Sequence, residues 1–221
     1  MKNENNNKPE LTLDGSFTLY SKLFDEHYHS INGAVTESRH IFIELGFKQI
    51  DKNHIDILEV GYGTGLNAIC TFIANKELNK TINYVGIEKY PISLADFEKL
   101  NYGKLLNVEE LELKGFYNDW DCSVKIDKDF VLTKLKADFL NYIPEIEYDI
   151  IYFDSFSPDT QAEMWTFEML RKIVHNLRKD GLFVTYSVRG ELKANLRKLG
   201  MEVKRLPGPP GKRHVLKAKK L

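Results

Sequence analysis

The chain of 221 residues is poor in the features that mark several large classes of protein. It has only two cysteines, Cys70 and Cys122, too few and too far apart for a disulfide framework or a zinc site. His27 and His29 lack a third metal ligand nearby, so we predict no metal site. No apolar run approaches the roughly 20 residues that cross a bilayer, and the polar start lacks the apolar core of a secretory signal. We therefore expect a soluble cytoplasmic protein with no membrane partner.

Net charge is also small, at −1, which by itself does not suggest a nucleic-acid partner. The distribution of charge is more informative, because residues 204–221 contain seven basic side chains and no acidic one. A basic edge on an acidic body can bind phosphates. A solubilising tail would explain the last lysines equally well, but it explains poorly the Pro/Gly-rich turn 207–211 that leads into Lys212 and Arg213.

The segment Ile57–Asn67 is the most informative part of what the chain does contain. A short apolar run is followed by Gly61, Gly63 and Gly65 and then by a helix-compatible stretch. This order places a tight turn at the carboxyl end of a buried strand, where open α/β sheets bind ligands. The spacing G-x-G-x-G does not fit the dinucleotide fingerprint, and no Lys-Ser/Thr pair makes a phosphate loop. It resembles instead the S-adenosylmethionine loop of Rossmann-like methyltransferases.

Two acidic residues further along the chain fit the same cofactor. Glu88 ends a second apolar run about one βαβ unit later, where a carboxylate can accept hydrogen bonds from both ribose hydroxyls. Asp138 precedes Phe139 at a point where methyltransferases of this class often place an acid near the adenine amino group. A strand-end carboxylate in water is the alternative for Glu88, and a helix N-cap is the alternative for Asp138.

The remaining pattern alternates strands with helices and predicts an α/β fold with a mostly parallel, doubly wound sheet of seven strands that ends in an antiparallel edge pair. Residues 1–50, with a hairpin at 11–20 around Asp-Gly and a helix at 36–45, are expected to form an extension packed on a methyltransferase domain of residues 51–221. The expected strands are 55–60, 82–88, 131–136, 149–153, 182–187, 201–205 and 213–218, with a hairpin before 131–136 left open as an alternative. The expected helices are 65–75, 92–101, 161–178 and 190–199.

Asp154 is the candidate catalytic residue. It follows the apolar strand 149–153, so it should lie at the carboxyl edge of the sheet beside the cofactor, where a carboxylate can orient an amine and take its proton. Loop capping is the alternative role. Tyr62, Phe156 and Trp165 are candidates for stacking on an unpaired base, although Trp165 could equally pack the following helix.

Several motifs together resemble one family. They are residues 61–67, 154–158 (DSFSP), 163–166 (EMWT), 211–216 (GKRHVL) and 33–39 (GAVTESR), in this order. The combination is similar to the methyltransferase domain of MnmC, also found alone as MnmD. The resemblance implies methylation of the 5-aminomethyl group of wobble uridine, giving 5-methylaminomethyl-2-thiouridine, with tRNA bound by its anticodon region. MnmC proteins carry a further flavin-dependent oxidase domain that is absent from these 221 residues, so only methyl transfer is predicted.

On this reading S-adenosyl-L-methionine is the cofactor. The residues expected around it are Glu37, Glu59, Gly61, Tyr62, Gly63, Gly65, Asn67, Glu88, Lys89, Asp138 and Phe139, and those expected at the substrate are Phe156, Pro158, Trp165, Lys212 and Arg213. Two other functions remain open. An aminopropyltransferase of the spermidine synthase type would carry an acid within the glycine turn, where this chain has Thr64. A non-catalytic RNA-binding protein would have no use for intact Glu88 and Asp154.

Overall fold

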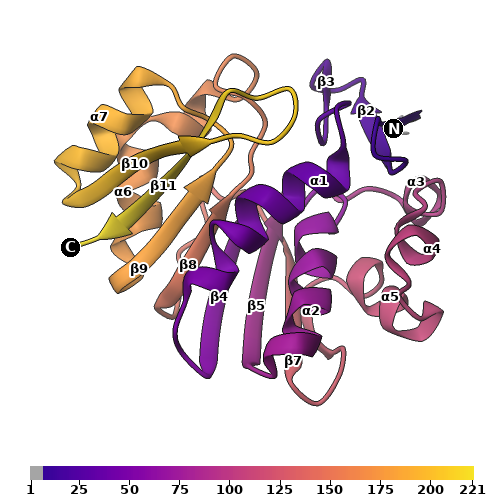
Figure 1. The fold of residues 1–221 in the computed structure, drawn as a ribbon. Helices are drawn as coiled ribbons and strands as arrows, with labels where there is room; N and C mark the ends of the chain where they lie inside the picture. The colour runs from indigo at the N-terminus through magenta and orange to yellow at the C-terminus, as the bar shows by residue number, and fades with distance from the viewer. Residues whose placement is uncertain (1–6) are drawn as a thin grey trace.

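One mixed sheet of eight strands organises the chain, which the computed structural model describes from residue 7 to residue 221 (Figure 1). The four central pairings are parallel, and the pairings at both edges are antiparallel. The predicted α/β class is confirmed. In spatial order the strands are β10 (Met201–Pro207), β11 (His214–Lys220), β9 (Leu177–Thr185), β8 (Tyr148–Phe153), β4 (His54–Val60), β5 (Thr81–Glu88), β7 (Phe130–Lys136) and β6 (Cys122–Lys125).

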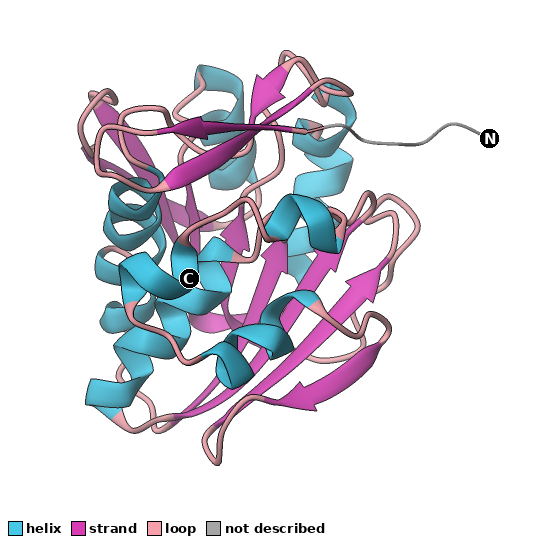
Figure 2. Ribbon diagram, turned by 90° about the vertical axis from the view of Figure 1, so that its right-hand side faces the viewer, coloured by secondary structure: helices cyan, strands magenta, loops and turns pink. Residues whose placement is uncertain are grey.

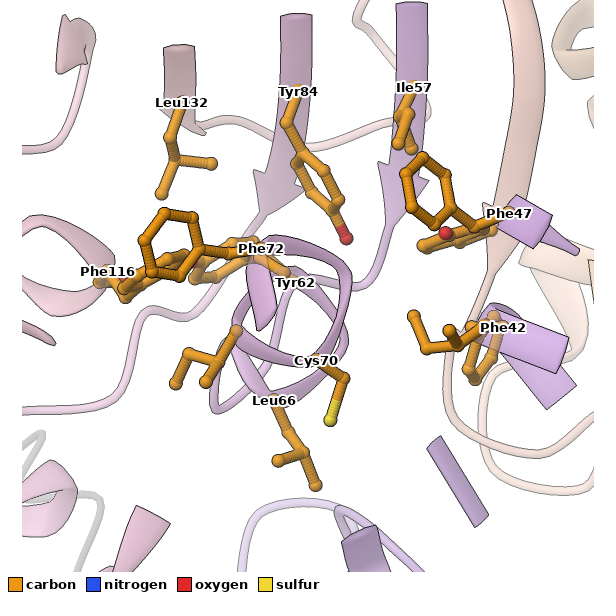
Figure 3. Close-up of a cluster of buried hydrophobic side chains, with 14 of the residues drawn as sticks. Phe42, Phe47, Ile57, Tyr62, Leu66, Cys70, Phe72, Tyr84, Phe116 and Leu132 are labelled. Carbon is orange, nitrogen blue, oxygen red and sulfur yellow. The ribbon is translucent and has the colours of Figure 1, made fainter. Parts of the chain in front are cut away.

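The central strands are buried on both faces, and their side chains alternate between two hydrophobic clusters. In β8, for example, Tyr152 faces one cluster and Phe153 faces the other, as the two-residue period of a strand requires. Helix α2 (Leu66–Leu78) packs on the first face through residues such as Phe72 (Figure 3), and α6 (Phe167–His175) and α7 (Gly190–Lys198) pack on the second. The near-continuous apolar strands seen in the sequence are therefore explained by helices on both faces.

Residues 8–27 form a separate three-stranded sheet that Figure 2 shows across one end of the molecule. The predicted hairpin is confirmed: β1 (Lys8–Leu11) pairs antiparallel with β2 (Phe17–Ser21), although the loop between them is longer than an Asp-Gly turn. Strand β3 (Glu26–His27) adds to β2. The predicted helix 36–45 corresponds to α1 (Ala34–Ser38), the π-helical turn η1 (Arg39–Glu44) and then η2 (Phe47–Gln49). The division of the chain at residue 50 stays a prediction.

The structure corrects three details of the predicted elements. The sheet has eight strands rather than seven, because β6 forms a hairpin with β7. The single helix expected at 92–101 is replaced by the short α3 (Leu94–Phe97) and α4 (Tyr102–Leu106), followed by α5 (Glu110–Tyr117). The helix expected at 161–178 begins as the 3₁₀ turn η3 (Ala162–Trp165), because the Thr166 hydroxyl caps α6 by accepting a hydrogen bond from the Met169 N–H.

None of the helices in residues 7–221 combines the length and the apolar character needed to span a bilayer. Within the same residues no group of three or more His, Cys, Asp or Glu side chains is arranged to hold a metal ion.

Candidate active site

A cavity of about 290 Å³ lies at the carboxyl ends of β4, β5 and β8, beneath the N-terminal sheet. Gly61 and Gly63 line it from the turn after β4, Glu88 from the end of β5, and Asp154 from the turn after β8. The three strands are adjacent and parallel, so their carboxyl ends meet at one edge. The predicted proximity of the glycine turn to Asp154 is therefore observed.

The glycine turn approaches the Asp154 segment so closely that no side chain would fit. All three turn glycines have positive φ, and a Cβ on Gly61 would lie 2.6 Å from the Asp154 carbonyl oxygen. The N–H groups of Gly61 and Tyr62 both donate to the Ile87 carbonyl, at 3.0 Å. The turn thus links the ends of β4, β5 and β8 and leaves bare backbone along the cavity wall.

Glu88 faces this turn from the neighbouring strand. Its carboxylate accepts hydrogen bonds from the N–H of Gly63 at 3.0 Å and from the N–H of Tyr90 at 2.8 Å. Burial raises the pKa of Glu88 above its usual value, and these hydrogen bonds oppose that effect. The carboxylate is therefore fixed at the edge of the cavity.

Asp154 is held by its backbone and by one amide. Its N–H donates to the Val60 carbonyl at 2.9 Å, and its Oδ2 accepts from Asn67 Nδ2 at 2.8 Å. Burial, and then the nearby charge of Glu37, raise the pKa of Asp154 to about 7, against the opposing effects of Asn67 and Lys212. A carboxylate that titrates near neutrality is suited to exchanging a proton with a bound ligand.

Asn67 connects Asp154 to a second acid that lies behind the cavity. The same Nδ2 donates to Glu59 Oε1 at 2.8 Å, and the Tyr84 hydroxyl donates to Glu59 Oε2 at 2.7 Å. Ser38 Oγ donates to the side-chain oxygen Oδ1 of Asn67 at 2.6 Å, which fixes the orientation of the amide. Burial raises the pKa of Glu59 well above its usual value. Glu59 and Asn67 thus support the Asp154 side chain without lining the cavity.

At the far side of the cavity, Asp138 and Phe139 follow β7. Lys89 Nζ lies 2.8 Å from Asp138 Oδ2, and Asp138 Oδ1 accepts a hydrogen bond from the Leu140 N–H. The pKa of Asp138 is lowered because its contacts with Lys89 and the Leu140 N–H outweigh burial, which alone would raise it. Asp138 therefore caps the turn that follows it, and its carboxylate also lines the cavity.

Residues 111–221 match the model of a family described as S-adenosyl-L-methionine-dependent methyltransferases. The chain belongs to this family. The predicted cofactor, S-adenosyl-L-methionine, is thereby confirmed.

The methyltransferase is also similar to curated proteins named tRNA 5-methylaminomethyl-2-thiouridine biosynthesis bifunctional protein MnmC. That of Pseudomonas fluorescens is 28% identical and covers 94% of this chain, and that of Burkholderia multivorans is 26% identical and covers 90%. The predicted resemblance is confirmed. The chain spans about one third of the length of these relatives, 34% and 33% respectively.

Two solved structures show the same fold. MNMC2 from Aquifex aeolicus has a TM-score of 0.76 at 24% identity and covers 99% of this chain and 72% of its own. Spermidine synthase from Thermotoga maritima has a TM-score of 0.56 at 13% identity, covering 93% of this chain and 68% of its own. At such low identities the likeness extends to the fold alone.

Aromatic side chains from the N-terminal segment cover the cavity of the methyltransferase. Phe24 stacks on Phe156 with 4.3 Å between ring centres, and Tyr28 meets the same ring edge-on at 5.2 Å. His29 Nε2 lies 2.8 Å from Thr64 Oγ1, and burial lowers the pKa of His29 to about 4. These contacts join loops far apart in sequence, and no local pattern indicates them.

Tyr186 is another cavity residue that the sequence analysis missed. Its hydroxyl donates to the Ser155 carbonyl at 2.8 Å, so its ring lies against the Asp154 turn. Tyr186 directly follows Thr185, the last residue of β9. Tyr186 follows β9 as Asp154 follows β8, so the position after the end of a parallel strand, which indicated Asp154, also indicates Tyr186.

Some of the expected site residues line the cavity and others do not. Trp165 is only 6% exposed and donates from Nε1 to the Phe156 carbonyl at 2.9 Å, which favours packing over stacking on a base. Tyr62, at 3% exposed, has its ring in the hydrophobic core and leaves little face for a base. Glu37, Gly61, Tyr62, Gly63, Glu88, Lys89, Asp138, Phe139, Asp154, Phe156 and Lys212 line the cavity, whereas Glu59, Gly65, Asn67, Pro158, Trp165 and Arg213 do not.

Proposed function

We propose that this methyltransferase transfers a methyl group from S-adenosylmethionine to the primary amine of the 5-aminomethyl group on a wobble uridine of tRNA, giving 5-methylaminomethyl-(2-thio)uridine. The observation that carries the proposal is the Asp154 carboxyl, with a pKa of about 7, in the same cavity as the glycine turn. The printed names of the MnmC relatives, which concern the biosynthesis of this nucleoside in tRNA, support the choice of substrate.

The residues at the cavity edge fit the cofactor. The bare backbone at Gly61 and Gly63 allows close approach, and the half-buried Glu88 carboxylate is placed to accept hydrogen bonds from a pair of hydroxyls such as those of ribose. Asp138 and Phe139 offer an acceptor and an apolar surface to the adenine. When bound, the cofactor supplies a methyl group on a positively charged sulfur, which is already a good electrophile.

The chain's own residues then have two tasks. Phe156 and the aromatic side chains around it exclude water and position the base, which brings the amine nitrogen in line with the methyl carbon. Asp154, oriented by Asn67, accepts a hydrogen bond from the amine and takes the proton that nitrogen loses as it becomes secondary. The carbon–sulfur bond breaks as the carbon–nitrogen bond forms, and S-adenosylhomocysteine leaves.

The proposed surface for tRNA is the basic hairpin β10–β11. Arg205 and Arg213 are exposed there, whereas Lys204 pairs with Glu202 at 2.9 Å. Arginine side chains bind phosphate with two parallel hydrogen bonds, so these two are the stronger candidates.

The aminopropyltransferase alternative is disfavoured at one position. In place of the acid it predicts within the glycine turn, the chain has Thr64, which is 1% exposed and bonded to His29 rather than open to a substrate amine.

Nucleoside mass spectrometry tests the proposal. The full chain is incubated with S-adenosylmethionine and tRNA that carries either 5-aminomethyl-2-thiouridine or unmodified uridine at the wobble position. We expect a gain of one methyl group on the aminomethyl nucleoside only. Transfer from decarboxylated S-adenosylmethionine to putrescine would favour the aminopropyltransferase instead. Failure to bind S-adenosylmethionine in isothermal titration would favour a non-catalytic RNA-binding protein.

A further inference from the structure

The Lys212 side chain points into the active-site cavity rather than away from the protein. It leaves the turn between β10 and β11, and its Nζ lies 2.6 Å from Glu37 Oε1 and 4.3 Å from the centre of the Tyr186 ring. Lys212 lines the cavity together with Glu37 and Tyr186. Its neighbour Arg213, by contrast, is exposed. Lys212 is therefore part of the site and not of the outer basic surface.

Glu37 is an unusual partner for this lysine because it is buried. The residue is 7% exposed, and its Oε2 accepts a hydrogen bond from the Ser30 N–H at 2.8 Å. Its Oε1 accepts no well-aligned hydrogen bond from residues 7–221, in which the Lys212 ammonium is its only ion-pair partner. Without that ammonium the buried oxygen would have no partner among these residues, which is costly for the fold, so this position requires a cation.

The Tyr186 ring, on the other side of the Lys212 ammonium, is also held in place. The Tyr186 hydroxyl donates to the Ser155 carbonyl, next to Asp154, so the ring face that Lys212 covers is anchored to the catalytic turn. A carboxylate oxygen and an aromatic face on two sides of one point are the standard receptor for an alkylammonium group. The Lys212 ammonium shows that such a group fits there.

The turn that carries Lys212 is positioned by the N-terminal segment, which lies beside it in Figure 1. A Cβ on Gly211 would lie 2.1 Å from Asn32 Nδ2, and His40 Nε2 lies 2.8 Å from the Pro207 carbonyl oxygen. These contacts hold the turn on both sides of Lys212, whereas the Lys212 side chain itself is 30% exposed. A displaced ammonium would therefore move by rotation of the side chain, with the turn held in place.

We propose that Glu37 and the face of Tyr186 form a subsite for the primary ammonium group of the substrate, and that Lys212 fills this subsite with its own ammonium until the substrate displaces it. The bound ammonium passes one proton to the Glu37 carboxylate and becomes the neutral amine that attacks the methyl group, and Asp154 takes the second proton, which the nitrogen loses as it becomes secondary. The identity of the displacing group rests on the function proposed above, in which the acceptor is an aminomethyl group. Once displaced, Lys212 lies beside Arg213, where a phosphate of the bound RNA can pair with it. A neutral group of the same size cannot take the place of the cation, so the subsite also selects for an amine.

Removal of the lysine ammonium tests the subsite directly, by ligand-observed NMR titration of the full chain with ethylammonium chloride at constant ionic strength. In Lys212→Met the subsite is vacant, and we expect ethylammonium to bind at least about fivefold more tightly than in the natural protein, about 1 kcal/mol. Lys212→Gln should show the same gain. Lys212→Arg keeps a cation in place and should show none. 1-Propanol, of similar size but uncharged, should bind all four proteins equally.

A double variant separates the receptor from a general change of charge. Adding Glu37→Gln to Lys212→Met should remove the gain in ethylammonium binding. Equal or weaker binding by both vacated variants, or a gain that survives Glu37→Gln, would overturn the proposal. Because these titrations need neither tRNA nor turnover, a gain without methyl transfer to tRNA would refute the proposed function and leave the subsite standing. Methyl transfer to tRNA without the gain in ethylammonium binding would refute the subsite and leave the proposed function standing.

Discussion

Buried or half-buried carboxylates lie at both ends of the parallel strands, and the two groups differ in what balances their charge. At the amino end, Asp56 and Asp149 lie 2.8 Å and 2.7 Å from Arg178 Nη1, and Lys52 Nζ lies 2.5 Å from Asp149. Burial raises the pKa of Asp56, but hydrogen bonds from Arg178 and Asn83 outweigh it and leave the pKa low. These carboxylates are matched by cations within the fold.

At the carboxyl end, Glu37, Glu88 and Asp154 line the cavity and Glu59 lies behind it, and burial raises the pKa of Glu59, Glu88 and Asp154. In residues 7–221 the only cation paired with any of the four is Lys212, which binds Glu37. Paired buried charges serve the fold, whereas unpaired ones cost stability and are kept where a ligand supplies the missing partner. The two ends thus differ in how the charge of their carboxylates is balanced, and we expect the carboxylates at the carboxyl end to be the functional ones.

Among the carboxylates at the two ends, Asp154 should matter most for catalysis. Asp154→Asn keeps the size of the side chain but removes the proton acceptor, so we expect kcat for methyl transfer to fall by about 10²–10⁴-fold. Binding of S-adenosylmethionine, measured by isothermal titration, should stay within about threefold. The matched control is Asp56→Asn, which should lower stability and leave kcat per folded molecule unchanged. A natural rate in Asp154→Asn would remove this residue from the chemistry.

The pH dependence of stability should have opposite signs at the two ends. The native pKa of Asp154, about 7, lies above its ordinary value of 3.8, so the folded state holds a proton that the unfolded chain loses in between. The cost of burying Asp154 therefore grows from about pH 4 to pH 7, and Asp154→Asn should become progressively more stable than the natural protein over that range.

For Asp56 the native pKa is lowered, so its contribution is present at neutral pH and is lost as the pH falls below about 4. Asp56→Asn should be less stable than the natural protein at neutral pH, and this difference in unfolding free energy should shrink only below about pH 4. Urea unfolding of both variants between pH 3 and pH 8 gives the two curves. Parallel curves would mean that the two carboxylates do not differ in environment.

The strand-end residues can be predicted from the sequence because the carboxyl ends of parallel strands meet at one edge of the sheet. Apolar runs ending at Val60 and Phe153, followed by glycine or by an acid, place Gly61 and Asp154 at one edge whatever the loops do. The eighth strand was less predictable, because β6 is short and mostly exposed and lacks a clear alternating pattern.

The cover of the cavity could not be predicted in the same way. Tyr28 and Phe24 reach Phe156 only through the packing of the N-terminal sheet on the main one, which no local pattern encodes. The sequence predicts that Lys212 binds the substrate as part of a basic edge for phosphates, but it gives only the charge of a turn and not the direction of its side chains. Its inward position depends on Glu37, 175 residues earlier in the chain.

A smaller effect is expected from the paired end of the sheet. Arg178→Met keeps much of the aliphatic stem but leaves Asp56 and Asp149 short of a cation, which is destabilising because both are buried. Since the Arg178 side chain is itself 31% exposed, we expect a loss of only about 1–2 kcal/mol in unfolding free energy. Methyl transfer measured well below the melting temperature should not change. A comparable loss in rate would show that the two ends are coupled.

The smallest effect should come from Asp138, which belongs to the cavity edge but resembles the paired end in its contacts. It already has a cation, Lys89, in an exposed ion pair, and it caps the following turn through the Leu140 N–H. Asp138→Asn keeps an acceptor oxygen for that turn and for an adenine amino group, so binding of S-adenosylmethionine should weaken by only about two- to fivefold, within 1 kcal/mol. Isothermal titration of Asp138→Asn beside Lys89→Met measures this. A loss of S-adenosylmethionine affinity greater than tenfold in Asp138→Asn alone would place Asp138 among the carboxylates that serve the site. The cofactor would then need the negative charge of Asp138 and not merely an acceptor oxygen.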